Sequence, residues 1–495
     1  MERTCFQIHP NDNVAVALRD LPKGSPLAPD FPDVVLSEDI PMGHKAALRE
    51  IPAGAPVIKY GFPIGRASRP IEKGAWVHSH NLSSAIRASE QYEYHPVPFS
   101  APAPAAPAFF SGYRRKSGRA GIRNEVWILP TVGCVAPLAE RLARAAEPLS
   151  AGRADAVTAF SHPYGCSQAG GDEENTQNLL ASLACHPNAG GVLVLGLGCE
   201  NSGVEKIRAR MGDFDPDRVR FLKAQDCGDE FSETMAVLEE LLAQTARDRR
   251  EPIPASELVV GLKCGGSDGF SGLTANPLVG RFSDHLCALG GATILTEVPE
   301  MFGAEALLMD RCADESLFRQ AVELIGGFKD YYTRHDTPVS ENPSPGNRAG
   351  GITTLEEKSL GCVQKAGHSP VLGVVSYGER ALGPGLHLLQ SPGNDLVSAT
   401  ALSAAGAHMV LFTTGRGTPF GCPVPTVKIS TNSGLAARKG HWIDFDAGSL
   451  LAGEPPEALE KKLFEKVLAT ASGTKTRSEE AGYREMAIFK DGVTL

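Results

Sequence analysis

From residue 112 onward, short apolar stretches alternate with longer stretches of helical character, and this alternation limits the fold more than any other feature. Between residues 112 and 250 the predicted strands are Glu125–Val132, Ala154–Phe160, Gly191–Leu197 and Arg218–Ala224. The helices predicted to follow them are Ala136–Ala146, Glu173–Leu183 (with Asp172 as its N-cap), Val204–Met211 and Asp229–Ala246. Because strands that alternate with helices form mostly parallel sheets, we expect a Rossmann-like α/β domain over residues 112–250.

The same alternation predicts a second Rossmann-like α/β domain over residues 251–495. Its predicted strands are Leu258–Leu262, Ala292–Glu297, Val371–Ser376, His408–Thr413 and Val424–Ile429. Its predicted helices are Pro277–Leu289, Glu315–Arg334, Asp395–Ala405 and Leu459–Ala471. The segment Asn342–Gly351, with the sequence NPSPGNRAGG, is predicted to be an irregular loop, and such loops inside compact domains are usually functional or mobile.

Residues 1–95 have a pattern typical of a small β-rich domain. Its predicted strands, separated by turns rich in Pro and Gly, are Val14–Leu18, Val57–Tyr60 and Trp76–His80. Lys45–Arg49 is predicted to form one helical turn. A domain of this size buries little core alone, so we expect it to dock on a larger one. Residues 96–111 are rich in Pro and Ala, which predicts an extended tether between the two.

Histidines in this small domain are the first candidates for chemistry. In an extended strand, side chains two residues apart point the same way, so His78 and His80 are expected to share one face. His44 and Lys45 lie in the same turn-rich domain. A pair of histidines on one face can begin a metal site or an acid–base pair. Spacing alone supports equally well the alternative of two histidines at a strand edge without function.

Cysteine follows one predicted strand after another. Cys134, Cys166 and Cys199 come after the first three strands of the middle domain. Ligands of parallel sheets bind beyond the carboxyl ends of the strands, so we expect two or three of these thiols to face a common site. Thiolates favour zinc, iron or iron–sulfur chemistry, although a free cysteine is often only a small buried hydrophobe. The chain has no C-x-x-C pair, and its eleven cysteines are an odd number, so neither a zinc ribbon nor a disulfide framework is expected.

Loops near the predicted strand ends offer polar groups for a ligand. The Gly-rich stretch from Gly265 to Asn276, which contains Ser267, leads into a helix and can hold a carboxylate or phosphate. It matches neither the P-loop nor the dinucleotide fingerprint, so no nucleotide cofactor is expected. Asn432, after the last strand, is equally well explained as a helix N-cap. The basic loop that ends at Arg123 and Asn124 can bind a substrate carboxylate or be a solvated surface loop.

Charge and hydropathy exclude several classes of protein. A net charge of −10 and a pI near 5.8 argue against a nucleic acid or an anionic membrane as the main partner. No run of 18 apolar residues occurs, so no transmembrane helix is expected. The N-terminal sequence lacks an apolar signal core, which predicts a cytoplasmic location.

Several long motifs resemble the altronate/galactarate dehydratase family of sugar-acid hydro-lyases. In residues 1–95 they are GHKAALREIPAGAPVIKYGFPIG and WVHSHN, which resemble a SAF (β-clip-like) domain. In the rest of the chain they are GRAGIRNEVWILPTVGC, HPYGCSQ, GLGCEN, LKCGGSDGFSGLTANP and TPFGCPVPTVKISTNS. Together the motifs extend over nearly the whole chain. Its length and layout are most similar to the altronate branch of the family.

The resemblance implies removal of water from a polyhydroxy acid, D-altronate to 2-keto-3-deoxy-D-gluconate, with galactarate or another sugar acid as the alternative substrate. It also implies iron, with manganese as a substitute. The C2 proton beside a carboxylate is weakly acidic, so a cation must stabilise the enediolate while a base and an acid act at C2 and C3. A sugar-acid-binding protein without turnover is the alternative of a different class. We expect a homodimer, the commonest oligomer.

We assign roles to the candidate residues on this basis. The residues expected to transfer protons are His44, Lys45, His78 and His80. The residues expected to hold the carboxylate and hydroxyls of the substrate are Arg123, Asn124, Ser267, Asn276 and Asn432. The candidate metal ligands are His78, His80, Cys134, Cys166 and Cys199. All of them are expected to meet in one cleft, which the small N-terminal domain closes.

Overall fold

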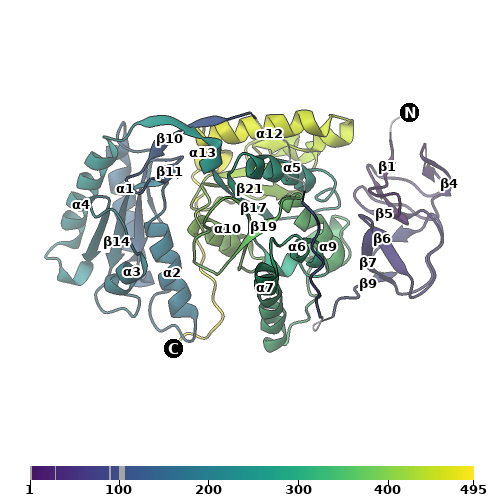
Figure 1. Ribbon diagram of the computed structural model, residues 1–495, viewed down its shortest axis with the longest axis horizontal. Coiled ribbons are helices and arrows are strands. Elements are labelled where there is room, and N and C mark those ends of the chain that lie inside the picture. The colour runs from purple at the N-terminus through teal and green to yellow at the C-terminus, as the bar shows by residue number, and fades with distance from the viewer. Residues whose placement is uncertain (1–2, 28, 88–90, 100–105) are drawn as a thin grey trace.

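The computed structural model describes residues 3–27, 29–87, 91–99 and 106–495, which form three domains in a row. Figure 1 shows the C-terminal domain in the centre, with the middle domain on one side of it and the N-terminal domain on the other. A three-stranded sheet of β11 (Ala120–Gly121), β10 (Phe109–Arg114) and β16 (Arg250–Pro254) links the middle and C-terminal domains. β10 therefore begins within the last residues of the predicted tether.

The N-terminal domain is built from short antiparallel strands. One sheet has the order β1 (Cys5–Phe6), β2 (Val14–Ala17), β5 (Lys45–Ala47), β8 (Trp76–Val77). A second has the order β6 (Pro56–Lys59), β7 (Phe62–Ala67), β9 (Leu82–Ser83), and β3 (Pro26–Leu27) pairs with β4 (Phe31–Val35). Part of its apolar interior, including Val57 and Ile64, is continuous with the hydrophobic core of the C-terminal domain. The small domain thus completes its core by docking, as its size requires.

The middle domain contains a four-stranded parallel sheet. Its order is β13 (Val157–Ala159), β12 (Glu125–Pro130), β14 (Ala189–Gly196), β15 (Val219–Lys223). The surrounding helices are α1 (Ala136–Ala146), α2 (Asp172–Ala184), α3 (Val204–Arg210) and α4 (Glu230–Thr245). Every residue of β14 is buried, as expected for a strand covered on both faces.

The C-terminal domain contains a seven-stranded parallel sheet. Its order is β19 (Val371–Val375), β20 (Gly385–Leu389), β18 (Ala292–Leu295), β17 (Val259–Cys264), β21 (Met409–Thr414), β22 (Thr426–Ser430), β23 (Phe445–Asp446). Its longer helices are α5 (Ala275–Ala288), α7 (Glu315–Arg334), α9 (Leu355–Cys362), α10 (Asp395–Ala404) and α12 (Pro456–Ala471). Shorter helices are α6 (Ala306–Met309), α8 (Pro345–Ala349), α11 (Ser433–Arg438) and α13 (Arg477–Glu480). The C-terminal segment then crosses to the middle domain and ends beside α2 (Figure 1).

Three local predictions are wrong. Lys45–Arg49 is not a helical turn, because Lys45 to Ala47 pair with β2 and β8 as strand β5. The segment 342–351 is not wholly irregular, because Ser344 and Asn347 form a capping box that starts α8. Asp172 does not cap α2; it is the first helical residue, and its carboxylate accepts the amides of Asp491 and Gly492.

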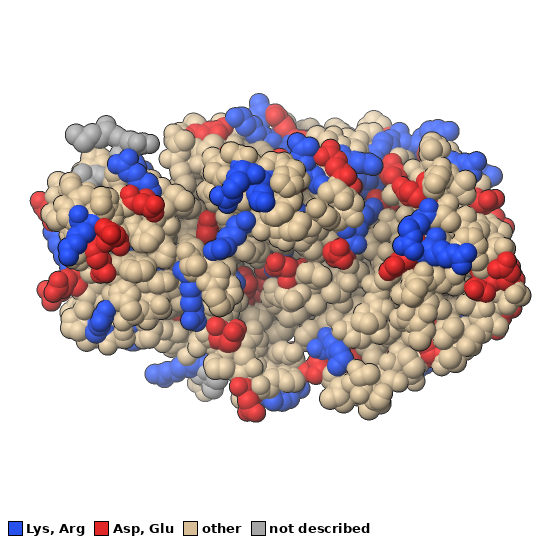
Figure 2. Space-filling view, turned by 180° about the vertical axis from the view of Figure 1, so that it is seen from behind, with Lys and Arg blue, Asp and Glu red and all other residues tan. Residues whose placement is uncertain are grey.

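Among the described residues, no helix is both long and apolar enough to cross a membrane. Lys and Arg side chains are interspersed with Asp and Glu side chains over the face that Figure 2 shows. On that face the described residues therefore form no broad surface of a single charge.

Candidate functional site

Three glycines bring the N-terminal and C-terminal domains into backbone contact. A Cβ atom on Gly269 would lie 2.0 Å from the carbonyl oxygen of Gly43, and one on Gly351 would lie 2.2 Å from the same atom. Gly43 itself has a φ of +83°, which a side chain would strain. The turn before β5 therefore fits between the Gly-rich loop after β17 and the loop after α8. Docking places the GHK motif against the carboxyl edge of the seven-stranded sheet.

A buried carboxylate shared by two ammonium groups locks this contact. Glu357 on α9 accepts Lys45 Nζ at 2.9 Å and Lys59 Nζ at 2.8 Å, and all three side chains are at most 1% exposed. Burial opposes the charge of Glu357, but the two lysines outweigh it and lower the pKa of this carboxyl group to about 2. Burial lowers the pKa of Lys45 to about 8, so the amine is still mostly protonated at neutral pH. The pair of N-terminal lysines and Glu357 thus form an ion triad across the domain interface.

Lys45 also orients His78 through Thr353. Lys45 Nζ contacts Gly351 O at 2.7 Å, Thr353 Oγ1 at 2.9 Å and Glu357, so all three of its protons have acceptors. Thr353 Oγ1 in turn lies 2.9 Å from His78 Nδ1. Since an ammonium only donates, Thr353 accepts from Lys45 and can direct its own proton to His78 Nδ1. This arrangement favours the tautomer in which His78 carries its proton on Nε2.

The His44 ring is fixed by hydrogen bonds at both of its nitrogens. Trp76 Nε1 donates to His44 Nδ1 at 3.2 Å, so His44 Nε2 carries the proton and faces Ala349 O at 3.4 Å. Burial and the Lys45 ammonium lower the pKa of His44, and they lower the pKa of His78 to about 4. Both rings are therefore neutral near pH 7, and their centroids lie 5.0 Å apart.

The predicted strand over Trp76–His80 ends at Val77, so His78 and His80 do not share a strand face. They lie in the following turn, where the Asn81 side chain accepts the amide of His78. His78 is half-buried and His80 is exposed, and each ring lies 5.4 Å from the Trp76 indole. For the Nε2 atom of His78 and for both nitrogens of His80, no hydrogen-bond partner is found within the described ranges. These two imidazoles are the ones left available for a ligand.

Ser267 and Asn276 belong to a second buried cluster, at the carboxyl end of β17. Both contact the Cys264 thiol, Ser267 Oγ at 2.8 Å and Asn276 Nδ2 at 3.8 Å, and both are at most 1% exposed. Asn276 also binds Gly361 O and Thr413 Oγ1. These partners leave the two side chains inside the protein, so a role in direct substrate binding stays an untested prediction.

Next to them lies a network of buried charges that the sequence did not reveal. Glu297 binds Lys263 and, at 3.0 Å, Lys365. Glu300 binds Lys358 at 2.7 Å. Glu297 is a non-glycine residue with a φ of +68°, and burial raises its pKa to about 7. Strained backbone and a shifted carboxyl pKa are features typical of functional sites, and here they occur at the end of β18.

Asn432 is the N-cap of α11, which was the alternative reading of this residue. Its Oδ1 accepts the amide of Leu435 at 2.8 Å, and its Nδ2 lies 3.3 Å from Asp268 Oδ2. Asn432 also lines a cavity of about 860 Å³ between the N-terminal and C-terminal domains. Arg3, Arg19 and Met42 form the N-terminal wall, and Met42 directly precedes the Gly43 contact. A cavity of this size accommodates a small polar molecule.

Arg123 and Asn124 lie elsewhere and are fully engaged in structure. The five N–H groups of Arg123 bind Glu479, at 2.7 and 2.9 Å, and the carbonyls of Ile122, Thr470 and Thr474. Asn124 binds Arg115 and the carbonyl of Thr245, and is 3% exposed. Their geometry supports the packing of the middle domain against the C-terminal domain and leaves no donor of Arg123 for a substrate.

The three strand-end cysteines are exposed, but they do not meet the histidines. Cys134, Cys166 and Cys199 lie on the middle domain, which Figure 1 shows on the opposite side of the C-terminal domain from the N-terminal domain. The expectation of one cleft that unites cysteines and histidines is therefore wrong. Sequence order along the sheet placed the three thiols after strands that prove to be neighbours, but it did not predict which face the docked domain covers.

The residues at the domain interface do not form a ready metal site. His44 and His78 supply two imidazoles, of which His44 has both nitrogens bound within the protein. Among residues 3–27, 29–87, 91–99 and 106–495, no group of three or more His, Cys, Asp or Glu is placed to hold a metal ion. The interface therefore does not fit a mononuclear iron ion, and we derive no step of the reaction through one there.

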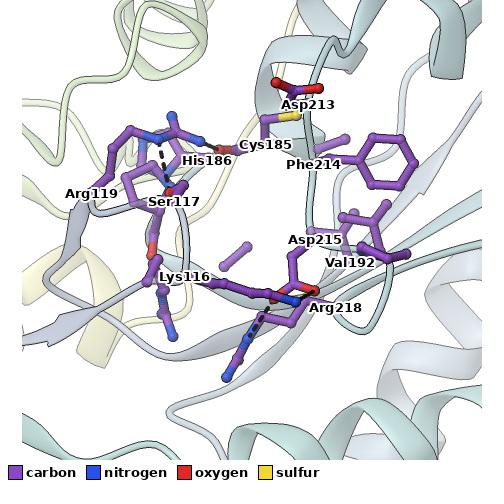
Figure 3. A pocket seen from close by; sticks show the side chains of 16 residues that line it. Lys116, Ser117, Arg119, Cys185, His186, Val192, Asp213, Phe214, Asp215 and Arg218 are labelled. Atoms are coloured by element: carbon purple, nitrogen blue, oxygen red, sulfur yellow. Dashed lines mark hydrogen bonds and ion pairs between the residues drawn. The ribbon is translucent and has the colours of Figure 1, made fainter.

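A smaller cavity of about 250 Å³ lies in the middle domain at the amino ends of β14 and β15 (Figure 3). Its cations are largely paired within the protein. Lys116 lies 3.6 Å from Asp215, and Arg119 donates to the carbonyl of Cys185. Arg218 binds Asp248. This cavity is not lined by His44, His78 or His80.

Sequence reasoning missed Thr353, Glu357 and Glu297, together with three of the lysines that bind the two glutamates: Lys59, Lys263 and Lys365. Thr353 and Glu357 stand about 300 positions after their N-terminal partners, and no local pattern links them. The signal that was present is the paired Glu356-Glu357 in the first turn of a helix that follows a Gly-Gly turn. Acidic residues there are also favoured by the helix dipole, so the pair did not stand out.

Comparison with known proteins agrees with the motifs. Residues 3–85 match the family model for the altronate/galactarate dehydratase SAF domain. Residues 112–246 match D-galactarate dehydratase/altronate hydrolase, second domain, and residues 255–494 match D-galactarate/altronate dehydratase, C-terminal. The chain is 53% identical over 492 residues to an altronate dehydratase of Escherichia coli (strain K12), covering 99% of both chains. It is 50% identical over 496 residues to one of Bacillus subtilis (strain 168), covering 100% of both.

A galactarate dehydratase (L-threo-forming) of Escherichia coli (strain K12) is 35% identical over 516 residues, 98% of this chain and 96% of its own. The resemblance seen in the motifs is thereby confirmed, and the N-terminal domain is a SAF domain. The chain belongs to the altronate/galactarate dehydratase family.

Proposed function

We propose that this protein is a hydro-lyase that removes water from D-altronate to give 2-keto-3-deoxy-D-gluconate. The observation that carries the proposal is identity of 53% and 50% to two altronate dehydratases over essentially the whole of each chain. Identity to the galactarate dehydratase is 35%, which favours the aldonate over the aldarate as substrate. We also propose that both parallel-sheet domains are Rossmann-like.

We assign the substrate to the region where the SAF domain docks. The cavity of about 860 Å³ there is large enough for a six-carbon sugar acid, and its N-terminal wall contributes two arginines, Arg3 and Arg19. Arg3 lies 3.5 Å from Asp30 there, so its charge is partly offset within the protein. Asn432 lines the opposite wall and stays a candidate for a hydroxyl contact.

His78 is the proposed proton donor. Its ring is neutral near pH 7 because burial and Lys45 lower its pKa to about 4, and Thr353 favours the proton on Nε2. A neutral imidazole that presents an N–H group can stabilise negative charge that develops on a substrate oxygen, or protonate a leaving hydroxyl group. Lys45 is then a positioning residue, since all its protons have protein acceptors.

His80 is the proposed base. It is exposed, lies beside the same indole as His78, and has no partner within the described ranges. His80 does not line the cavity of about 860 Å³, so it can accept the C2 proton only of a sugar acid that extends from the cavity to the Trp76 indole. His44 does not suit this role, because both of its ring nitrogens are engaged in the protein.

Other properties stay predictions from the sequence. They are the requirement for iron or manganese, the absence of a nucleotide cofactor, a homodimer and a cytoplasmic location. Neither nucleic acid nor a membrane is proposed as a partner.

The test is a panel of sugar acids assayed for 2-keto acid formation by the protein loaded with ferrous iron under reducing conditions. We expect turnover with D-altronate at a kcat/KM above that with galactarate, glucarate or mannonate. Turnover confined to galactarate would assign the other branch of the family. If altronate stabilises the protein against heat while no keto acid forms, the sugar-acid-binding alternative replaces the enzyme.

A further inference from the structure

Three exposed thiols stand at the carboxyl edge of the four-stranded sheet, away from the histidine site. Cys134 follows β12, Cys166 follows β13 and Cys199 follows β14. These strands are neighbours in the sheet, with β12 between the other two. Exposed free cysteines are reactive and oxidise easily, so three of them at one edge of a sheet indicate a functional role for these thiols.

Hydrogen bonds join each pair of the three loops that carry the thiols. Gly133 N donates to Tyr164 O at 2.9 Å, which joins the Cys134 loop to the Cys166 loop. Ser202 N donates to Gly165 O at 2.9 Å, which joins the Cys166 loop to the Cys199 loop. Thr131 Oγ1 donates to Glu200 at 2.6 Å, which joins the Cys199 loop to the end of β12. Rigid positioning of this kind is typical of ligand sets that are organised before the ligand binds.

Close backbone packing adds to the rigidity. A Cβ atom on Gly165 would lie 2.0 Å from Thr131 O, so the residue before Cys166 must be glycine. Ser167, the residue after Cys166, has a φ of +54°, a conformation that non-glycine residues rarely adopt. Asn201 Oδ1 accepts the Ser167 amide at 3.1 Å and lies 3.3 Å from Cys166 Sγ. Strained turns that surround an exposed thiol are typical of functional loops and of the backbone cradles that hold iron–sulfur centres.

The chemistry of the three thiols indicates which metal they would bind. A set of three thiols favours soft metals, above all zinc and iron–sulfur clusters. A single zinc ion requires its ligands around one point, and no three described His, Cys, Asp or Glu are placed to hold one ion. In an iron–sulfur cluster the thiolates bind different iron atoms, so the ligands are further apart. A cluster therefore fits three thiols on adjacent strand ends better than a single ion does.

We propose that Cys134, Cys166 and Cys199 are the protein ligands of a sulfide-bridged iron cluster. The inference goes beyond the dehydratase activity and rests on the thiols and their loops alone. On binding, each thiol loses its proton to solvent as the thiolate joins iron. Iron and sulfide come from outside the protein.

The experiment uses the full chain, purified without air and incubated with iron salts, inorganic sulfide and a thiol reductant. The readouts are bound iron, acid-labile sulfide and visible absorption, none of which depends on turnover. We expect iron and sulfide in about equal amounts, and loss of most of both in Cys134→Ser, Cys166→Ser and Cys199→Ser. Cys227→Ser is the matched control. Cys227 lies after β15, the fourth strand of the sheet, but its Sγ donates to its own turn at Lys223 O, so this variant should keep the cluster.

Circular dichroism and thermal unfolding of each variant show whether it has folded like the parent protein. Iron without sulfide, a bound zinc ion, or full cluster content in any well-folded variant of the three would overturn the proposal. A protein that binds the cluster but does not dehydrate altronate leaves this site in place and refutes only the proposed function. The reverse result, turnover without a cluster, refutes only this inference.

Discussion

The variant Glu357→Gln tests whether charge locks the SAF domain to the C-terminal domain. The carboxylate is 1% exposed and accepts Lys45, Lys59 and the Thr353 amide at 2.8–2.9 Å. Removing one member of a buried ion pair destabilises a protein by about 3–5 kcal/mol, because a charge is left without compensation. Lys45, whose pKa in the docked protein is about 8, can lose its proton at a cost of only about 1.4 kcal/mol at pH 7. The larger loss therefore falls on Lys59, whose pKa is raised beside Glu357 and which stays charged.

At about 1.4 kcal/mol for each factor of ten, the loss corresponds to a roughly 10²- to 10⁴-fold rise in the undocked fraction of the SAF domain. Hydrogen–deuterium exchange measures it in the peptides that contain β5, β6 and α9, whose amides should exchange faster by about that factor.

The matched control is Glu240→Gln on α4. Glu240 is 65% exposed and lies 3.9 Å from Arg220, and exposed pairs contribute about 0–1 kcal/mol. Exchange in the SAF domain should not change in this variant. If Glu357→Gln leaves the exchange of β5 and α9 within threefold of the parent protein, the triad does not hold the interface and the reasoning is refuted.

Four further predictions follow from named contacts. Thr353→Val removes the hydroxyl that orients His78, so kcat should fall about 10²-fold, the size typical of a lost acid–base contribution, while Thr353→Ser keeps most of it. Acidification should weaken the domain interface, because the pKa of Glu357 is lowered from its ordinary 4.5 to about 2. The stabilisation that the Glu357 carboxylate gives is complete above pH 4.5 and is lost as the pH falls toward 2. Hydrogen–deuterium exchange measured over this pH range checks the prediction. Gly269→Ala places a Cβ atom 2.0 Å from Gly43 O and should raise KM and lower the melting temperature, whereas Gly327→Ala, in open space on α7, should not. Arg123→Lys loses the two-point contact with Glu479 and should lower stability while KM for altronate stays constant.

The sequence predicts the sheets well because their strands are buried on both faces and appear as continuous apolar runs. Helix Glu315–Arg334 was predicted to the residue, since Asp314 caps it and its apolar face repeats with helical period. Strand β20 was missed because Gly385 to Leu389 directly follows a Gly-Pro turn and is too short to stand out. The turn at Lys45 was misread because local propensity does not reveal that two partner strands flank it.

The site was predictable only in its N-terminal half. His44, Lys45 and His78 stood out as unusual residue types in a small turn-rich domain, and the structure brings them within one contact network. Arg123 and Asn124 stood out equally, yet their partners are structural. An arginine that forks onto Glu479 has the same local sequence as one that forks onto a substrate. Only the tertiary position of the partner distinguishes the two cases.

Docking and chemistry depend on the same atoms at this interface. Lys45 holds the carboxylate that locks the SAF domain, and through Thr353 it also sets the tautomer of the proposed proton donor. An undocked SAF domain therefore carries an unoriented His78, so variants that loosen docking should lose kcat in proportion to the undocked fraction. Thr353→Val should depart from that relation, because it removes the orienting hydroxyl while the ion triad stays intact. If instead its kcat falls only as far as its docking equilibrium shifts, Thr353 acts by holding the interface, and His78 gains nothing specific from the hydroxyl.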